Sequence, residues 1–331
     1  MSRRVTVQVP VRVCDVGGWS DTWFAGHGRV CSLAVEPGVS VEATAAPGDG
    51  SVVVEAADFG VTFTVGSEPP VHRLLADAVR EAGDIGPCDV RLRVTAAVPP
   101  SSSFGTSAAV CVAVIAALDA LRGSVRAPDV LAAAAHRAEV ERFGRECGVQ
   151  DQIAAAYGGA NLIDIVAYPK AVTRPLAVPP GVANALDERL LHVAYGSAHD
   201  SSAVHEEVIA ALTDEGPSSS RLERVRALAD DAARALVAGD LDAYGAVLTA
   251  ATDAQAALHP ALVSDAACEL IAVARSSGAV GWKVNGAGGA GGSLSILAGS
   301  RAQRDRLVAD AERLGHHPIP LSLATQGARA T

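Results

Sequence analysis

The chain has 331 residues, of which 49% are hydrophobic and 19% charged, a composition typical of well-buried globular proteins and a length that suits two domains. Its formal net charge of −10 argues against nucleic acid as a partner, because binding nucleic acid needs clustered cationic surface. Six scattered cysteines without metal-ligand spacing, no signal peptide and no apolar run of membrane-spanning length predict a cytoplasmic protein with no membrane partner.

The first half of the chain begins with strands and continues with helices. Residues 3–65 read as short strands with turns at 47–50 and near Gly60. The elements expected next are helix 71–82, strand 88–96, helix 107–121, helix 128–143 and a helix from Gln150 to 158–159. Helix 107–121 is apolar nearly all round, which predicts a central buried helix.

The second half is expected to form a separate domain of mixed strands and helices. The tract from Tyr168-Pro169 to Pro179-Pro180-Gly181 is the best candidate for a boundary, and it divides the chain into domains 1–178 and 179–331. The elements expected beyond it are strand 189–195, helices 203–213, 218–238, 241–257 and 262–277, strands 279–284 and 293–297, helix 301–314 and a last strand 319–323.

A loop rich in serine joins strand 88–96 to the apolar helix. It reads Val98-Pro99-Pro100-Ser101-Ser102-Ser103-Phe104-Gly105-Thr106-Ser107-Ala108-Ala109. The unpaired amides of a first helical turn and the positive end of the helix dipole point at whatever occupies such a loop, which is an anion-binding geometry. A nucleotide phosphate is the expected ligand of such a loop. The alternative is an ordinary turn between a strand and a helix, capped by serine.

A second unusual loop occupies residues 286–292, between two apolar strands. It holds five glycines and two alanines, so its backbone can approach a ligand or another loop closely. A hairpin connection needs only about two to five residues with one or two glycines. The excess of glycine favours a surface that admits something bulky, and a loose hairpin is the alternative.

Together with the N-terminal segment, these two loops resemble the three signature motifs of the GHMP kinases, the superfamily of galactokinase, homoserine kinase, mevalonate kinase and phosphomevalonate kinase. The N-terminal segment runs from Val9 to Thr22 and ends Gly17-Gly18-Trp19-Ser20-Asp21-Thr22. The glycine loop follows Lys283-Val284-Asn285. The string Gly-Gly-Trp-Ser-Asp-Thr is most similar to the sugar-kinase branch, near L-fucokinase and D-glycero-D-manno-heptose 7-phosphate kinase.

The resemblance implies an α+β fold of GHMP kinase type that uses ATP and Mg²⁺. Its N-terminal domain is expected to be ribosomal-protein-S5-domain-2-like and its C-terminal domain ferredoxin-like, with the active site between them. The residues implied to bind ATP are Pro100, Ser101, Ser102, Ser103, Gly105, Thr106, Ser107 and Ala108.

Two carboxylates in the first half resemble the acidic pair of galactokinases. Carried over from that family, Glu139 becomes the Mg²⁺ ligand, helped by the hydroxyl of Ser107 or alternatively of Thr106, and Asp151 becomes the base that accepts the proton of the sugar hydroxyl. Arg12 matches the arginine that pairs with this base. The alternatives are a dipole-stabilised carboxylate in a first helical turn for Asp151, a solvent-facing strand residue for Arg12, and Glu141 as the ligand in place of Glu139.

The residues implied to bind the sugar come from the first and third motifs. Asp21 matches the family's acceptor for sugar hydroxyls, and Trp19 is available to stack on the sugar ring. The alternative for Asp21 is an Asx turn. Gly18 and Trp19 stand where galactokinases carry glutamate and histidine, which points away from galactose. Gly288 and Gly289 complete the implied substrate site.

The serine loop departs from the family pattern. Ser101 and Ser103 stand where glycine is usual. These serines must therefore adopt a negative φ or bear the cost of a left-handed backbone.

The leading interpretation is an ATP-dependent kinase that acts on a sugar hydroxyl, most readily the anomeric C1 hydroxyl, as a monomer or homodimer. One alternative is an acceptor that already bears phosphate, such as a heptose 7-phosphate, with His199, Arg29 or Arg145 in an additional cationic pocket. The other is a non-catalytic sugar sensor, against which the retained acidic pair and its arginine speak.

Overall fold

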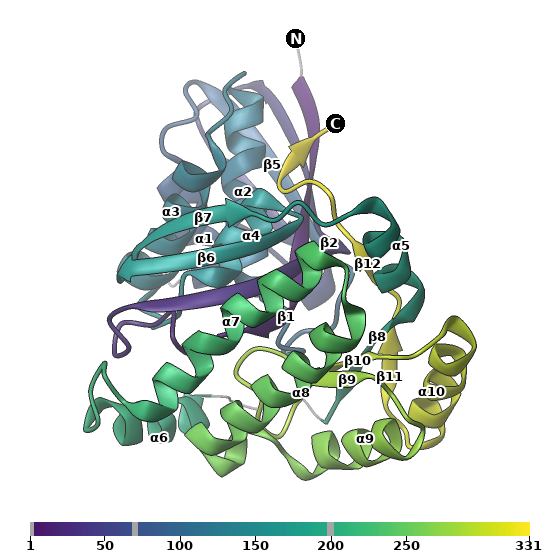
Figure 1. Cartoon of the computed structure of the whole chain (residues 1–331). Coiled ribbons are helices and arrows are strands. Elements are labelled where there is room, and N and C mark those ends of the chain that lie inside the picture. Colours follow the sequence, from purple (N-terminus) through teal and green to yellow (C-terminus); the bar gives the residue numbers. More distant parts are fainter. Residues whose placement is uncertain (1–2, 68–71, 197–201) are drawn as a thin grey trace.

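The computed structural model describes residues 3–67, 72–196 and 202–331, and these residues form two β-sheets with helices packed against both (Figure 1). The sheets have nine and four strands within this part of the chain. Among the described residues, no helix has the length and apolar character needed to cross a membrane.

Two long antiparallel strands, β1 (Arg3–Val16) and β2 (Gly28–Pro47), lie at the centre of the first sheet. The sequence predicts short strands here, and that prediction is wrong for both. Each strand contains a proline, Pro10 or Pro37, which lacks an amide donor and reads as a strand breaker. The two prolines lie at one register shift in the pairing, so the ladder resumes beyond them and the strands continue.

Strand β2 organises the rest of this sheet. The other strands are β3 (Val52–Ala56), β4 (Val61–Thr64), β5 (Cys88–Ala96), β6 (Ala160–Ala167), β7 (Lys170–Pro175), β12 (Ser322–Leu323) and β13 (Arg329–Ala330). β1, β5, β6 and β12 all pair with β2, and only the pair β3–β5 is parallel among the described strands.

The buried helix that the sequence predicts is α2 (Thr106–Leu121). Eleven of its sixteen residues are buried, because it packs against β1 and β2 on one side and against other helices elsewhere. Those helices are α1 (Arg73–Ala82), α3 (Pro128–Arg137) and α4 (Gln150–Tyr157). Helix α3 continues into a π-helical segment, Ala138–Phe143, so the helix predicted over 128–143 changes its winding at Ala138.

The second sheet is antiparallel in the order β11 (His317–Ile319), β8 (Leu190–Tyr195), β10 (Gly292–Leu297) and β9 (Gly281–Val284). Helices α9 (Asp265–Ser276) and α10 (Arg301–Arg313) cover it and share its separate apolar core. Helices α6 (Ser202–Thr213), α7 (Ser220–Ala238) and α8 (Leu241–Leu258) precede these (Figure 1). Because α7 packs on β2 and α8 packs on both β9 and β1, these two helices join the sheets.

Most of the second half follows the predicted order. The five predicted helices begin and end within three residues of the observed bounds. The tract proposed as a boundary begins in the turn of the β6–β7 hairpin, which the sequence analysis did not predict, and ends in helix α5 (Pro180–Arg189). The predicted strand 319–323 is divided into β11 and β12. β12 and β13 return to the first sheet, where they pair with β2 and β1.

Candidate active site

The three motif segments meet at one cleft with a volume of about 850 Å³. The end of β1, the serine loop before α2, the segment before α4 and the glycine loop after β9 all contribute to its walls. The predicted site residues in its lining are Arg12, Trp19, Asp21, Ser101, Ser102, Ser103, Gly105, Thr106, Ser107, Asp151 and Gly288. The predicted site residues outside the lining are Pro100, Ala108, Gly18, Gly289 and Glu139, of which Pro100 is exposed and the other four are buried.

The serine loop delivers the N-terminus of α2 to the cleft without a side-chain cap. Gly105 occupies the N-cap position with φ 73° and, as glycine, has no side chain to accept a hydrogen bond from the first-turn amides. The serine-capped turn, the alternative to an anion site, therefore does not form. Ser101 and Ser103 have φ of 58° and 59°, so both adopt the left-handed backbone, which costs about 1–2 kcal/mol for each non-glycine residue.

Asp151 and Arg12 form an ion pair at the floor of the cleft. Arg12 Nε donates to Asp151 Oδ1 at 2.8 Å, and the same guanidinium donates to the carbonyl oxygen of Ser103. Only 4% of Arg12 is exposed, so it is not a solvent-facing strand residue. Burial opposes its charge, but the carboxylates of Asp151 and Asp15 raise the pKa of Arg12 above its ordinary value.

Glu139 is buried beneath the N-terminus of α2. Gln152 Nε2 donates to Glu139 Oε2 at 2.5 Å. Burial raises the pKa of Glu139, and hydrogen bonds from Ser107 and Gln152 oppose that rise. Glu139 lies in the π-helical segment, a local winding that is frequent at functional sites. Glu141, its alternative, is exposed.

The residues around Glu139 fit a magnesium ion that is shared with phosphates. Within the described part of the chain, no group of three acidic, histidine or cysteine side chains is arranged to hold a metal. Mg²⁺ is commonly bound through one or two carboxylates plus substrate phosphates, rather than by a cage made only of protein. The hydrogen-bonded pair of Glu139 and the Ser107 hydroxyl supplies hard oxygen donors of that kind.

Asp21 is a second buried carboxylate in the cleft wall. The backbone amide of Gln150 donates to Asp21 Oδ2 at 3.1 Å. Burial raises the pKa of Asp21 to about 6, and the charge of Asp151 contributes to the rise against the hydrogen bond from Gln150. A Cβ at Gly148 would lie 1.9 Å from Asp21 Oδ2, so only glycine fits beside this carboxylate.

The aromatic and glycine residues predicted to hold the sugar lie in different places. Trp19 lines the cleft and has φ 74°, with its ring 6.5 Å from that of Phe24. Gly18 is buried against Asp15. Gly288 lines the cleft, whereas the amide of Gly289 donates to the carbonyl of Leu262 at 3.2 Å.

Of the three residues considered for an additional cationic pocket, one lines the cleft and one does not. Arg29 is paired with Asp164 and with Asp230, the latter at 2.6 Å, and does not line the cleft. Arg145 lines the cleft, with its guanidinium 5.8 Å from the ring centre of Phe143. His199 lies outside the described residues.

The sequence analysis assigned no role to several polar residues that the structure places at the cleft or directly beneath it. They are Asp15, Gln150, Gln152, Gln255, Lys283 and Asn285. One signal was available, because Lys283 is one of only two lysines in the chain and lies between apolar residues in a strand. The others become recognisable only through contacts between distant segments.

Comparison with known proteins agrees with this arrangement. The family model described as the GHMP kinases N terminal domain matches residues 70–159. This segment contains the serine loop, Glu139 and Asp151. The structure also matches that of Lactococcus lactis galactokinase complexed with galactose, with a TM-score of 0.74 over 99% of this chain and 95% of that one. The TM-score shows that the two share a fold, and at an identity of 17% the likeness extends no further than the fold.

The chain thus resembles the GHMP kinases in sequence over residues 70–159 and shares their fold as a whole. It is 26% identical over 320 residues to the bifunctional fucokinase/GDP-fucose pyrophosphorylase of Arabidopsis thaliana. The aligned region covers 89% of this chain and 30% of that protein. It is 25% identical over 208 residues to D-glycero-alpha-D-manno-heptose 7-phosphate kinase of Campylobacter jejuni, which covers 62% of this chain and 60% of that protein. The matched regions thus span less than two thirds of both relatives.

The mixed α+β fold of a GHMP kinase is therefore confirmed. In this fold the ends of β1 and β9 and the N-termini of α2 and α4 meet at the cleft, although these segments are far apart in the sequence. Two positive helix ends and the Arg12 guanidinium face a space that carboxylates also line. Such a site is suited to bringing a bound anion close to a group that accepts a proton.

Proposed function

We propose that this protein is an ATP-dependent sugar kinase that phosphorylates a sugar hydroxyl, most readily the anomeric C1 hydroxyl. The observation that carries the proposal is the pairing of Arg12 with Asp151 at 2.8 Å beside the uncapped N-terminus of α2. That pairing places an acceptor for a proton next to a site for phosphate. The relatives named as fucokinase and heptose 7-phosphate kinase support a sugar as the acceptor.

The phosphates of ATP are held by the serine loop. The first-turn amides of α2 and its dipole attract the phosphate oxygens, and the left-handed backbone at Ser101 and Ser103 shapes the loop around them. Glu139 and the Ser107 hydroxyl, which are hydrogen-bonded to each other, would hold Mg²⁺. When bound, this ion neutralises negative charge on the phosphates.

The transfer itself uses Asp151 and Arg12. Asp151 accepts the proton of the sugar hydroxyl while the oxygen of that hydroxyl attacks the γ-phosphorus. ADP leaves with the bridging oxygen. The guanidinium of Arg12 keeps Asp151 oriented and offsets negative charge near the transferring group. Asp21 accepts hydrogen bonds from sugar hydroxyls, and Trp19 covers the ring.

A second candidate is a kinase for a sugar that already bears phosphate. Arg145 favours it, because this cation lines the cleft and no carboxylate in the described ranges pairs with it. Arginine binds phosphate well through its planar fork of donors. The name of the heptose 7-phosphate kinase relative agrees with this alternative. For either acceptor we propose a cytoplasmic enzyme, in keeping with ATP as the phosphoryl donor.

The deciding experiment supplies Mg·ATP and a panel of acceptors, with ADP release as the readout. The panel contains fucose, arabinose, galactose, glucuronic acid, mannoheptose and mannoheptose 7-phosphate, with homoserine and mevalonate as acceptors that are not sugars. We expect turnover with a free sugar and a phosphorus NMR doublet coupled to the anomeric proton. Turnover only with the phosphorylated heptose selects the second candidate, and a preference for homoserine or mevalonate rejects sugar kinase activity. Sugar binding without ADP release identifies a sensor.

Asp151→Asn should lower kcat by a factor of about 10²–10⁴ while Mg·ATP binding stays close to that of the native chain. The base acts on the acceptor and does not hold the nucleotide. Asp164→Asn is the matched control, because Asp164 pairs with Arg29 outside the cleft lining. Native turnover in the Asp151 variant would exclude it as the base.

A further inference from the structure

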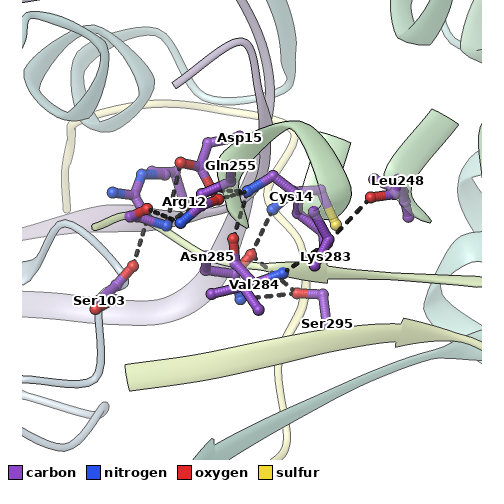
Figure 2. Close-up of polar contacts among 12 residues, drawn as sticks. Arg12, Cys14, Asp15, Ser103, Leu248, Gln255, Lys283, Val284, Asn285 and Ser295 are labelled. Atoms are coloured by element: carbon purple, nitrogen blue, oxygen red, sulfur yellow. Dashed lines mark hydrogen bonds and ion pairs between the residues drawn. The ribbon is translucent and has the colours of Figure 1, made fainter. Parts of the chain in front are cut away.

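A buried ion pair lies directly beneath the glycine loop, at the end of β1 (Figure 2). Asp15 is 1% exposed and Lys283 is 2% exposed, and Lys283 Nζ lies 3.8 Å from Asp15 Oδ1. Both carboxylate oxygens of Asp15 accept from the amide of Gly286, at 3.0 and 3.1 Å. The first residue of the glycine loop is therefore held by a charged acceptor.

The ammonium of Lys283 is completely enclosed by acceptors. It donates to Gln255 Oε1 at 2.7 Å and to the carbonyl of Val284. Gln255 also donates through Nε2 to the carbonyl of Gly286 at 3.0 Å, so the loop is fixed at both its amide and its carbonyl. Burial lowers the pKa of Lys283, and the charge of Asp15 opposes that change.

The same pair lies next to the catalytic arginine. A Cβ at Gly286 would lie 3.0 Å from a terminal nitrogen of Arg12 and 3.0 Å from the carbonyl oxygen of Ser103, so the loop backbone packs against both. Ser103 accepts a hydrogen bond from Arg12. Four side chains of alternating charge thus follow one another from the cleft to the interior: Asp151, Arg12, Asp15 and Lys283.

A purely structural role does not account for this arrangement. Taking two charges out of water costs more than such a pair usually returns, and apolar residues of similar size are often equally or more stabilising. The pair is also tied to β9 and β10, since Asn285 accepts from the Cys14 amide at 2.9 Å and donates to Ser295 at 3.0 Å (Figure 2). The network joins the first motif to the third at the point where Arg12 enters the cleft.

We propose that Asp15, paired with Lys283, is a positioning residue that fixes Gly286 and holds Arg12 against Asp151. This proposal rests on the proposed kinase function. Asp15 acts through the loop backbone and through Arg12, and it does not touch the substrates. Its negative charge attracts the Arg12 guanidinium, and the Gly286 backbone, which packs against Arg12, prevents Arg12 from moving away from Asp151.

Three variants test the proposal: Asp15→Asn, Lys283→Met and the two combined. Each single variant leaves one buried charge without its partner, so we expect a lower Tm. The double variant leaves neither charge unpaired, and we expect its Tm to return most of the way to the native value. We expect kcat to remain about 10- to 100-fold low in the double variant, with KM for Mg·ATP within about threefold of native.

This split between stability and turnover separates positioning from simple structural support. A double variant with native Tm and native kcat would overturn the proposal. Asp119→Asn is the matched control, because Asp119 is also buried and paired, with Arg122 and Arg126, but lies outside the cleft lining. It should lose Tm and retain kcat. If a single variant fails to fold, the double variant still decides between the two outcomes.

Amide hydrogen exchange tests the hydrogen bond between the Gly286 amide and Asp15 without reference to catalysis. We expect the Gly286 amide to exchange about five- to tenfold faster in the double variant, because a neutral acceptor replaces a charged one. Unchanged exchange at Gly286 would overturn the positioning role even if the protein phosphorylates some other acceptor. Faster exchange in a protein that transfers no phosphoryl group would refute the kinase function and leave the structural link intact.

Discussion

Glu139 and Asp21 are both buried carboxylates, yet they have different neighbours and different expected roles. Glu139 receives hydrogen bonds from side chains on α2 and α4, whereas Asp21 receives one from the backbone amide of Gln150. Burial raises the pKa of both groups, and to about 6 for Asp21. A carboxylate kept buried at this cost is expected to gain a ligand when the site is filled.

Glu139→Gln should raise the Mg²⁺ concentration needed for half-maximal turnover by about tenfold or more, because a hard cation prefers a charged oxygen ligand. Titration of ADP release with Mg²⁺ at fixed ATP measures the change. Glu141→Gln is the matched control, since this exposed residue lies in the same π-helical segment. If the Glu141 variant shows the increase and the Glu139 variant does not, the ligand role belongs to Glu141.

Asp21→Asn should stabilise the protein in a pH-dependent way. The folded-state pKa of about 6 exceeds the ordinary value of 3.8, so the folded state keeps its proton to higher pH than the unfolded state. The ionisation of Asp21 therefore lowers the free energy of unfolding of the native protein as pH rises from about 4 to 6. The full decrease, about 3 kcal/mol, is present above that range.

The asparagine variant does not titrate, so its advantage in free energy of unfolding should be largest at pH 7.5 and small near pH 4. Urea unfolding at both pH values measures it. An equal difference between variant and native protein at both pH values would show that Asp21 ionises normally. If Asp21 also binds sugar as the carboxylate, the native KM for sugar should rise as pH falls below about 6.

At the scale of single elements, the serine loop combines a helix N-terminus with a strained backbone. Ser103→Gly should raise the free energy of unfolding by about 0.5–1 kcal/mol, because glycine adopts the left-handed region freely but is more flexible when unfolded. Thermal unfolding measures the shift. Ser102→Gly is the control: Ser102 is not among the described residues with positive φ, and its hydroxyl donates to Pro99 at 2.5 Å. It should destabilise, and stabilisation by both variants would argue against strain at Ser103.

The sequence predicts those elements best whose signal is local. The apolar surface of α2 and the turn at 47–50 are visible in a short window, and both occur. The β6–β7 hairpin was missed because Tyr168-Pro169 reads as a linker, although it is the turn between two paired strands. The full length of β1 and β2 is not visible locally, because each strand contains a proline and the register shift that accommodates both prolines appears only in the pairing of the two strands.

The candidate site divides in the same way. Loop positions such as Ser107 and Gly288 follow from motif spacing, and the structure places them in the cleft lining. The Asp15–Lys283 pair joins residues that are far apart in the sequence, and nothing local in either segment indicates its partner. The same reason explains Arg29, which looks like a free cation in the sequence but pairs with Asp164 and Asp230 in the structure.

At the scale of the whole molecule, the C-terminal tail connects the end of the chain to the first sheet. The C-terminal end of the chain lies beside the first sheet (Figure 1). β13 pairs with β1, where Ala330 is the partner of Val7, and Arg329 lies 2.6 Å from Glu36. A Cβ at Gly327 would lie 2.0 Å from the carbonyl oxygen of Ala156, so the tail also packs tightly on the end of α4. We propose domains 1–178 and 179–331, with this tail, like α7, α8 and β12, among the parts of the second that pack on the first.

Removing residues 325–331 should therefore destabilise the first sheet, although these residues lie far from it in the sequence. The deletion exposes the β1 edge and removes the Arg329–Glu36 ion pair, so we expect a loss of about 2–3 kcal/mol and a Tm lower by roughly 4–10 °C. Scanning calorimetry measures it, and Arg329→Gln isolates the small contribution of the ion pair. Hydrogen exchange should then increase in β1 before it increases in β8–β10. A Tm equal to that of the native chain would show that the tail only rests on the sheet and that the remaining contacts of β1 stabilise it without help.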